Sequence, residues 1–315
     1  MRITKNTCLS QRYMKNSSTL RSPLFYVGDK FKLIEEIKTY FPTKINSFVE
    51  PFVGGGSVFL NVEAENYILN DIDKNVIALH KFLCSYSSKY DSFIRRCFQE
   101  IDSYGFSCSL RGMTVPEELK SKYKKTYYAE YNRQAYLSLR DDYNNSNRRN
   151  LFQLYLLLIY GFNHMIRFNA SGNFNLPVGN VDFNQNVDTA LRGYFQNVQS
   201  KSILWSSLDF KKFFKGLNLT EDDFVYLDPP YLITFSEYNK LWTPETERDL
   251  LSILDALNEK HIKFAISNVT HYKGKENTIF IEWARKYNVH NIKSNYISYH
   301  DNSVKNFQEV LVTNY

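Results

Sequence analysis

Apolar residues follow helical spacing over residues 30–41, where Pro42 ends the run, and a short apolar strand follows at residues 47–49. A glycine-rich turn comes next, after which the same alternation continues. The pattern there predicts a helix that begins at Ser57, a strand at residues 67–69 and a helix over residues 74–83. Strands that alternate with helices are typical of parallel sheets with crossover helices. This part of the chain therefore predicts an α/β domain.

The alternation stops at about residue 85 and resumes at about residue 203. In between, residues 86–150 are rich in Tyr, Arg, Lys, Ser and Asn, residues 151–159 form an apolar helical segment, and residues 160–180 resemble a loop. The later pattern predicts strands at 203–205, 224–227, 263–266, 289–292 and 310–313, and helices over 245–258 and 276–287. We expect one α/β domain, residues 23–80 and 189–315, divided by a mainly helical insertion of residues 81–188.

Lysine and arginine are unevenly distributed along the chain, which has a formal net charge of +6. Residues 1–22 carry +5, residues 23–75 carry −3, residues 76–188 carry +4 and residues 189–315 are neutral. Such asymmetry is expected when one part of a protein faces a polyanion and another binds a small, partly cationic ligand. Charge alone does not distinguish this arrangement from a chance scatter of surface side chains. We interpret residues 1–22, which lack the apolar block of a signal peptide, as a basic arm.

Composition narrows the class of protein further. Hydrophobic residues make up 43% and charged residues 23% of the 315 residues, which is typical of a globular protein and not of a disordered or collagen-like chain. The most apolar segment, residues 151–165, contains Gln153, Asn163 and His164, so it is too polar for a membrane span. The four cysteines are scattered and form no Cys-x-x-Cys pair. We therefore expect a cytoplasmic protein without a disulfide framework, a metal site or a membrane association.

The segment EPFVGGGSVFLN, residues 50–61, contains the first candidate chemistry. Its glycines at positions 54–56 permit backbone torsions closed to other residues and let a ligand approach the main chain. Asp71 ends the next predicted strand, where a carboxylate can accept hydrogen bonds from two ribose hydroxyls. No lysine follows the glycines as in a Walker phosphate loop, and the third glycine of the dinucleotide fingerprint is missing. The pattern favours a nucleoside ligand without a pyrophosphate.

The segment VYLDPPYL, residues 225–232, is an apolar strand that ends in Asp228, Pro229, Pro230 and Tyr231. The two prolines fix the backbone and lack N–H groups, so the carbonyl groups of Asp228 and Pro229 can face a ligand without competing donors. A planar amine requires two in-plane acceptors, and a carboxylate with a neighbouring carbonyl supplies them. Tyr231 offers a face on which the ring that carries the amine can stack.

Together, these segments resemble the Dam-type family of DNA adenine-N6 methyltransferases, the alpha group with a DPPY motif. The similarity includes SPLFYVGDKFKL (residues 22–33), NDID (70–73), GFNHMIRFNASGNFNLPVG (161–179) and EVLVTNY (309–315). It covers most of residues 22–315, although residues 86–150 match loosely and Asp29 replaces a glycine of the usual GGK. The resemblance implies a Rossmann-like methyltransferase fold with a mostly parallel seven-stranded sheet and an inserted, mainly helical target-recognition domain.

The resemblance also implies S-adenosylmethionine as the methyl donor, double-stranded DNA as the partner and no metal ion. The residues that would bind the cofactor are Tyr26, Lys30, Glu50, Phe52, Gly54, Gly56, Asp71 and Asp228. The residues that would hold the flipped adenine are Asp228, Pro229, Pro230 and Tyr231. Arg167 falls where relatives use an arginine to read a guanine, and Asn163, Asn169 and Asn175 complete the expected reading surface.

The expected reaction begins when the target nucleotide turns out of the duplex, at a cost of roughly a few kcal/mol. Asp228 and the Pro229 carbonyl then accept the two amine hydrogens, so that the nitrogen lone pair faces the methyl group. We expect a site-specific modification enzyme of a restriction-modification or phage-type system, with GATC as the target. It would be a monomer or weak dimer, and any cognate restriction endonuclease would act separately.

Two alternatives stay open at this point. Related motifs occur in enzymes that methylate other planar amines, namely cytosine N4, an RNA base or a protein glutamine. The Asp of DPPY and the segment GFNHMIRFNASGNFNLPVG (residues 161–179) favour adenine in DNA. The second alternative is a DNA-binding protein that keeps the fold without catalysis. The intact Asp71 and Asp228 argue against it, because a protein that only binds DNA has no use for a cofactor pocket.

Overall fold

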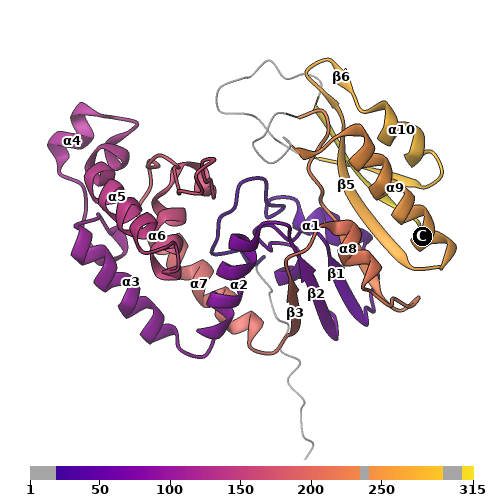
Figure 1. Cartoon of the computed structure of the whole chain (residues 1–315), viewed down its shortest axis with the longest axis horizontal. Helices are drawn as coiled ribbons and strands as arrows, with labels where there is room; N and C mark the ends of the chain where they lie inside the picture. Colours follow the sequence, from indigo (N-terminus) through magenta and orange to yellow (C-terminus); the bar gives the residue numbers. More distant parts are fainter. Residues whose placement is uncertain (1–18, 235–240, 294–306) are drawn as a thin grey trace, which may run out of the picture.

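The computed structural model describes residues 19–234, 241–293 and 307–315 (Figure 1). Its strands are β1 (Ser47–Glu50), β2 (Asn66–Asn70), β3 (Ser202–Ser206), β4 (Phe224–Leu227), β5 (Lys263–Tyr272), β6 (Lys275–Glu276), β7 (Asn288–Ile292) and β8 (Phe307–Thr313). They form one sheet in the order β3-β2-β1-β4-β5-β8-β7, with β6 paired to β5. The pairs from β3 to β5 are parallel, whereas β8 runs antiparallel to β5 and β7. The predicted α/β class is confirmed, and all seven predicted strands are present.

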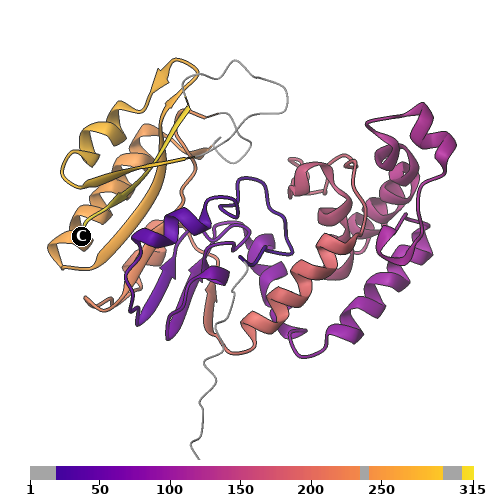
Figure 2. The same cartoon turned by 180° about the vertical axis from the view of Figure 1, so that it is seen from behind.

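Two hydrophobic cores cover the two faces of the sheet, because successive side chains of a strand point to opposite faces. Val49 and Val225 pack in one core, whereas Phe48 and Phe224, one residue earlier in each strand, pack in the other. The first core includes side chains of α8 (Phe210–Lys215), α9 (Pro244–Glu259) and α10 (Thr278–Ala284), and the second includes side chains of α1 (Ile34–Ile37), α2 (Lys74–Ser85) and α7 (Gln185–Val198). The α/β part therefore has three layers, which Figure 2 shows from behind.

The helix predicted over residues 30–41 is much shorter in the structure. Only α1 and a following 3-10 helix, Lys38–Tyr40, are helical. Before them the chain forms turns, in which the Leu33 N–H donates to the Lys30 carbonyl at 2.9 Å. The Lys30 side chain reaches Asp228, with 2.7 Å between Nζ and Oδ2. A tertiary ion pair therefore prevails over the local helical pattern.

The prediction of a helix from Ser57 is wrong, because only a 3-10 helix, Phe59–Asn61, forms there. The Asn61 amide nitrogen donates to the carbonyls of Ser57 and Leu20, at 2.8 Å each. Its oxygen accepts from the Leu20 N–H at 2.8 Å. Side-chain bonds of this kind compete with helical hydrogen bonds. The connection from β1 to β2 is consequently a loop with one tight turn.

The same contacts attach the end of the predicted basic arm to the α/β part. Leu20 is held by Asn61, Ser22 is fully buried, and the Arg21 guanidinium lies 4.6 Å from the centre of the Phe25 ring. Residues 1–18 of the predicted arm lie outside the described residues. Residues 19–22 therefore pack as part of the folded protein.

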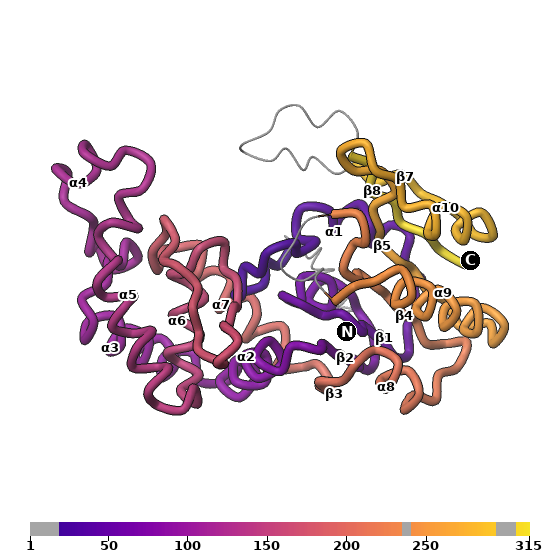
Figure 3. The backbone as a smooth tube through the Cα atoms, turned by 45° about the horizontal axis from the view of Figure 1, so that its top comes forward, coloured from indigo at the N-terminus to yellow at the C-terminus, as the bar shows by residue number. Residues whose placement is uncertain are grey.

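The polar middle segment forms helices beside the sheet, as Figures 1 and 3 show. They are α3 (Tyr90–Tyr104), α4 (Glu117–Lys122), α5 (Tyr127–Asn145) and α6 (Leu151–Tyr160). The central helix α6 is buried from Gln153 to Tyr160, and the Tyr160 hydroxyl donates to the Ser107 carbonyl at 2.7 Å. The proposed domain boundaries, near residues 81 and 188, fall inside α2 and α7, which connect these helices to the sheet. The division into domains stays a prediction.

Asn70, at the end of β2, connects the carboxyl ends of three neighbouring strands. Its amide nitrogen donates to the carbonyls of Pro51 (3.0 Å) and Leu208 (2.9 Å). Its amide oxygen accepts from the Ser206 hydroxyl (2.8 Å) and the Leu208 N–H (2.9 Å). The side chain is buried, and these four bonds use both donors and both acceptor positions of the amide. Asn70 therefore fixes the segments that follow β1 and β3.

We expect Asn70→Leu to lower the free energy of unfolding by about 3 kcal/mol, because it leaves several buried polar groups without partners. Urea denaturation followed by circular dichroism measures this change. Asn66→Leu, at an exposed position of the same strand, is the control and should change stability by less than about 0.5 kcal/mol. Unaltered stability of Asn70→Leu would contradict the structural role.

Candidate active site

Three adjacent strands bring the predicted functional segments to one edge of the sheet. β1 ends at Glu50, β2 is followed by Asp71, and β4 is followed by Asp228. Because β2, β1 and β4 are neighbours and run parallel, their carboxyl ends lie at the same edge. Open α/β sheets bind ligands in the crevice outside this edge. The glycine segment and the DPPY segment therefore face one region.

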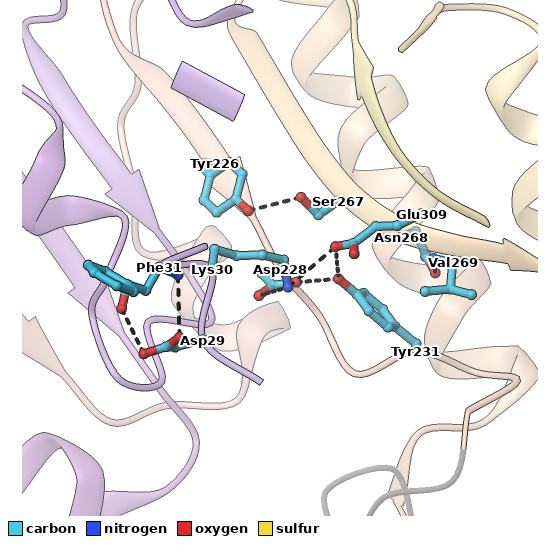
Figure 4. A network of polar contacts seen from close by, with 11 residues as sticks. Asp29, Lys30, Phe31, Tyr226, Asp228, Tyr231, Ser267, Asn268, Val269 and Glu309 are labelled. Atoms are coloured by element: carbon cyan, nitrogen blue, oxygen red, sulfur yellow. Dashed lines mark hydrogen bonds and ion pairs between the residues drawn. The ribbon is translucent and has the colours of Figure 1, made fainter. Parts of the chain in front are cut away.

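The Asp228 carboxylate is held by two partners (Figure 4). Its Oδ2 lies 2.7 Å from the Lys30 ammonium, and its Oδ1 accepts a hydrogen bond of 2.8 Å from the Tyr231 hydroxyl. Lys30 is buried, whereas Asp228 is partly accessible. The carboxylate is thus fixed in orientation and balanced in charge while one side remains open to a ligand. The stacking role expected for Tyr231 stays a prediction.

Glu309, on β8, is a third member of this network that the sequence did not indicate. Its Oε1 accepts from the Tyr231 hydroxyl at 3.1 Å and lies 3.6 Å from the Lys30 ammonium. Burial raises the pKa of Glu309, while the positive charge of Lys30 opposes that rise. The tyrosine hydroxyl has one hydrogen, so it donates to Asp228 or Glu309 but not to both at once. Its sequence signal was its position at the start of EVLVTNY, just before the apolar residues of the final predicted strand.

The glycine loop packs directly against the amino-terminal motif. A Cβ atom on Gly55 would lie 2.8 Å from the Tyr26 Cβ, so a larger residue has no room there. The Ser57 hydroxyl donates to Asp29 at 3.1 Å, and the same carboxylate accepts from the Phe31 N–H at 3.3 Å. Asp29, which departs from the usual glycine of the motif, therefore fastens this motif to the loop.

Asp71 anchors the loop from the other side. Its Oδ2 accepts from the Gly54 N–H and its Oδ1 from the Asp73 N–H, at 2.9 Å each. Gly54 adopts a positive φ of 46°, a conformation that favours glycine. Burial raises the pKa of the Asp71 carboxyl to about 6, although the two backbone bonds oppose this rise. Each oxygen keeps a second lone pair with which it can accept a ligand hydroxyl.

Glu50 is almost fully buried, with 2% of its surface exposed, and its Oε2 has no hydrogen-bond partner among the described residues. Burial, together with the negative charges of Asp228 and Asp71, raises its pKa well above the ordinary value. A buried carboxyl oxygen without a partner is costly unless a ligand supplies one. Glu50 is therefore suited to a donor group or a cation that enters the crevice.

Apolar side chains that the sequence did not indicate lie beside these polar groups. Ile72 follows Asp71 and is 67% exposed, and Leu208, whose carbonyl is bound by the Asn70 amide, is 44% exposed. Exposed apolar residues at strand ends are suited to the faces of a planar ring. The predicted cofactor residue Phe52 instead packs edge-on against Trp242, with 5.8 Å between ring centres. The signal for Ile72 was its position between the two acids of NDID.

The four predicted DNA-reading residues lie in one loop region after α6. Arg167 donates from Nε to the Asn175 side-chain oxygen at 3.0 Å and from Nη2 to the Asn175 carbonyl at 2.7 Å. Asn169 accepts from the Asn173 N–H at 2.9 Å, within a turn between the bridged Phe168 and Phe174. The exposed Asn163 has a positive φ of 53°.

The structure therefore brings Arg167 and Asn175 together and gives Asn169 a role in shaping the turn. Asn163 lies in the 3-10 helix Phe162–His164, next to the end of α6. Whether these four side chains read DNA stays a prediction.

A metal site and a membrane-spanning helix each have requirements that the described residues do not meet. Within residues 19–234, 241–293 and 307–315, no three His, Cys, Asp or Glu side chains are grouped to hold a metal ion. The helices in that same described part are each too short or too polar to cross a membrane.

A family model agrees with this geometry. The family described as D12 class N6 adenine-specific DNA methyltransferase matches residues 26–298. The match includes both the glycine segment and the DPPY segment, and it spans more than half of the chain. The chain belongs to this family of methyltransferases.

Individual relatives carry related names. The chain is 35% identical to the modification methylase StsI of Streptococcus sanguinis, over 99% of the chain and 46% of that protein. It is 34% identical to the type II methyltransferase M.FokI of Planomicrobium okeanokoites, over 96% of the chain and 44% of that protein. It is 29% identical to the DNA adenine methylase of Escherichia coli (strain K12), over 87% of each. The Dam-type resemblance is confirmed, and the chain spans about half the length of the first two relatives.

Proposed function

We propose that this chain transfers a methyl group from S-adenosylmethionine to N6 of adenine at a specific site in duplex DNA. The observation that carries the proposal is the position of the Asp228 carboxylate, held by Lys30 at the sheet edge that the glycine loop also occupies. The end of β4 binds the amine that accepts the methyl group, and the ends of β1 and β2 bind the methyl donor. Family membership supports the same reaction.

The residues around the glycine loop fit S-adenosylmethionine. Four carboxyl groups lie near the ends of these strands: Glu50, Asp71, Asp228 and Glu309. Among the described residues of this group, Lys30 is the one that carries a positive charge. Such a site favours a cationic ligand and disfavours phosphate groups. When bound, S-adenosylmethionine supplies a methyl group activated by a positively charged sulfur.

The chain's own residues divide the work of binding that donor. Asp71 accepts from the ribose hydroxyls, and Ile72 and Leu208 flank the adenine ring. Glu50 receives the amino group, because its free oxygen lacks a partner among the described residues. Tyr26 and Phe52 line the loop, and Gly54 to Gly56 let the donor approach the backbone.

The DPPY segment binds the acceptor base. Asp228 and the Pro229 carbonyl accept the two hydrogens of the adenine amine, and the missing N–H groups of Pro229 and Pro230 leave these acceptors free of competition. Lys30 and Tyr231 hold the Asp228 carboxylate in the required plane. As the new C–N bond forms, the methyl–sulfur bond breaks and the donor leaves as a neutral thioether, so positive charge moves to the amine nitrogen, where the carboxylate stabilises it. One amine hydrogen then leaves as a proton.

Target reading belongs to the loop around Arg167. Its Nη1 makes no hydrogen bond within the described residues, and Asn175 holds the rest of the guanidinium in place. An arginine fixed in this way is suited to the O6 and N7 atoms of guanine. We propose GATC as the target sequence. Asn163, Asn169 and Asn175 would either contact the bases or hold the loop in shape.

The relatives that are modification methylases suggest the biological setting. The chain would protect DNA in the cytoplasm against a restriction endonuclease that acts separately, as a monomer or weak dimer. In the proposed division, residues 23–80 and 189–315 form the catalytic domain. Residues 81–188 form the domain that recognises the DNA sequence.

Asp228→Ala is expected to abolish methyl transfer, with a loss of at least about a thousandfold, because the amine loses its charged acceptor. Tritium transfer to duplex DNA measures the rate, and gel shift should show DNA binding within about threefold of the parent protein. Asp249→Ala, an exposed acid on α9, is the matched control. Unchanged turnover in Asp228→Ala would refute the assignment, and label in N4-methylcytosine, RNA or protein would redirect it to another planar amine.

Arg167→Ala is expected to relax discrimination at one guanine, at a cost of roughly 1–3 kcal/mol. Sequencing of methylated bases in a DNA library identifies the target and its preferred positions. The exposed Arg133, on α5, provides the control Arg133→Ala, which should weaken binding to all sequences alike. An Arg167→Ala product with the parent sequence preference would remove this residue from the reading surface.

Affinity for S-adenosylmethionine is expected to fall as the pH decreases through about 6, the pKa to which burial raises Asp71. The ionised carboxylate accepts both ribose hydroxyls, whereas the protonated group does not, so Kd should rise by up to about tenfold per pH unit below that value. Titration calorimetry from pH 5 to 8 measures the profile. Asp71→Asn should bind weakly with a flat profile, and an identical pH dependence in both proteins would assign the titration to another group.

A further inference from the structure

His80, on α2, is a fully buried polar side chain that the proposed function does not use. Its Nε2 lies 2.9 Å from the Gly54 carbonyl oxygen, and its Nδ1 lies 3.0 Å from the Tyr194 hydroxyl on α7. The ring stacks on Trp205 of β3, with 4.8 Å between ring centres and 13° between planes. Three separate elements thus place this imidazole beneath the glycine loop.

The partners determine the protonation of the ring. A carbonyl oxygen only accepts, so Nε2 carries the hydrogen that it donates to Gly54. Nδ1 is then the acceptor, and the Tyr194 hydroxyl donates to it. The same hydroxyl lies 3.5 Å from the Cys84 sulfur, which can donate in turn. Burial lowers the pKa of His80 to about 4, so the ring is neutral at physiological pH.

The glycine loop is built around this ring. Gly54 is held at both backbone polar atoms, since Asp71 accepts from its N–H and His80 donates to its carbonyl. A Cβ atom on Gly56 would lie 2.9 Å from the His80 Cε1 and 2.3 Å from the Phe59 ring. Gly56 also has a φ of 80°. Contacts with His80, Phe59 and Asp71 therefore hold the loop in its conformation before any ligand binds.

We propose that His80 is a positioning residue that presents the glycine loop to the cofactor through the Gly54 carbonyl, and that Tyr194 acts through His80 by fixing its tautomer. The inference rests on the proposed function of the loop. His80 and Tyr194 lie on the two helices that lead into and out of the helical insertion, so the pair also joins that insertion to the cofactor side of the sheet.

Three variants separate the hydrogen bond from the packing. His80→Phe keeps a flat ring on Trp205 but loses the donor, and we expect Kd for S-adenosylmethionine to rise about tenfold in titration calorimetry. His80→Gln places an amide N–H near the position of Nε2 and should recover most of the affinity. Tyr194→Phe should weaken binding about threefold alone and add nothing in the His80→Phe background, because it acts through the same bond.

His290→Phe is the matched control, because His290 also lies against an aromatic ring, Tyr40, and contacts one acceptor, Thr313 Oγ1, at 3.1 Å. It should leave Kd within about twofold of the parent protein. A His80→Phe protein with unchanged Kd, or full additivity with Tyr194→Phe, would overturn the inference.

A second measurement does not depend on ligand binding. Amide hydrogen exchange over residues 54–58 of the free protein should be at least about fivefold faster in His80→Phe and unchanged in His290→Phe. Equal exchange in His80→Phe and the parent protein would overturn the positioning role. If the parent protein does not bind S-adenosylmethionine, the proposed function fails, while the exchange rates still decide whether His80 holds the loop.

Discussion

The ion pair between the buried Lys30 and the partly accessible Asp228 is the interaction on which the rest of the site depends. It joins an amino-terminal turn to the end of β4, and its charged atoms are 2.7 Å apart. Moving an ammonium group out of water costs several kcal/mol, and only a close partner with further hydrogen bonds offsets that cost. Glu309 and Tyr231 complete this environment. The pair therefore fixes where the amino-terminal motif crosses the sheet edge and folds over the glycine loop.

The same network determines the charge at this edge of the sheet. Two carboxyl groups, Asp228 and Glu309, face one lysine in this network, so this edge of the sheet favours a cationic over an anionic group when both carboxyl groups are ionised. Residues 76–188, by contrast, carry a net charge of +4. Under the proposed function, phosphates would stay on the helical side and the target base would leave the duplex to reach Asp228.

The sequence pattern predicted the strands well because the central parallel strands, such as β1 and β4, are buried and form continuous apolar runs that local composition makes visible. Two helix predictions failed. No α-helix begins at Ser57, because Asn61 binds Leu20, and none forms over residues 30–33, because Lys30 turns towards Asp228. Motifs led to the prediction of Lys30, Asp71 and Asp228 as site residues, because their neighbours in sequence are distinctive. They did not identify Glu309 or His80, because the roles of these residues arise from the order of strands and from contacts between distant helices.

Three consecutive glycines lose more conformational freedom on folding than any other residues, so a loop built from them is formed only if many contacts hold it. Here each glycine has its own restraint: Asp71 and His80 bind Gly54, Tyr26 packs on Gly55, and His80 and Phe59 pack on Gly56. The entropy is thus lost during folding and not during binding. A loop ordered in advance retains more of its contact energy as affinity. This explains why side chains from several other elements surround a segment that has no side chains of its own.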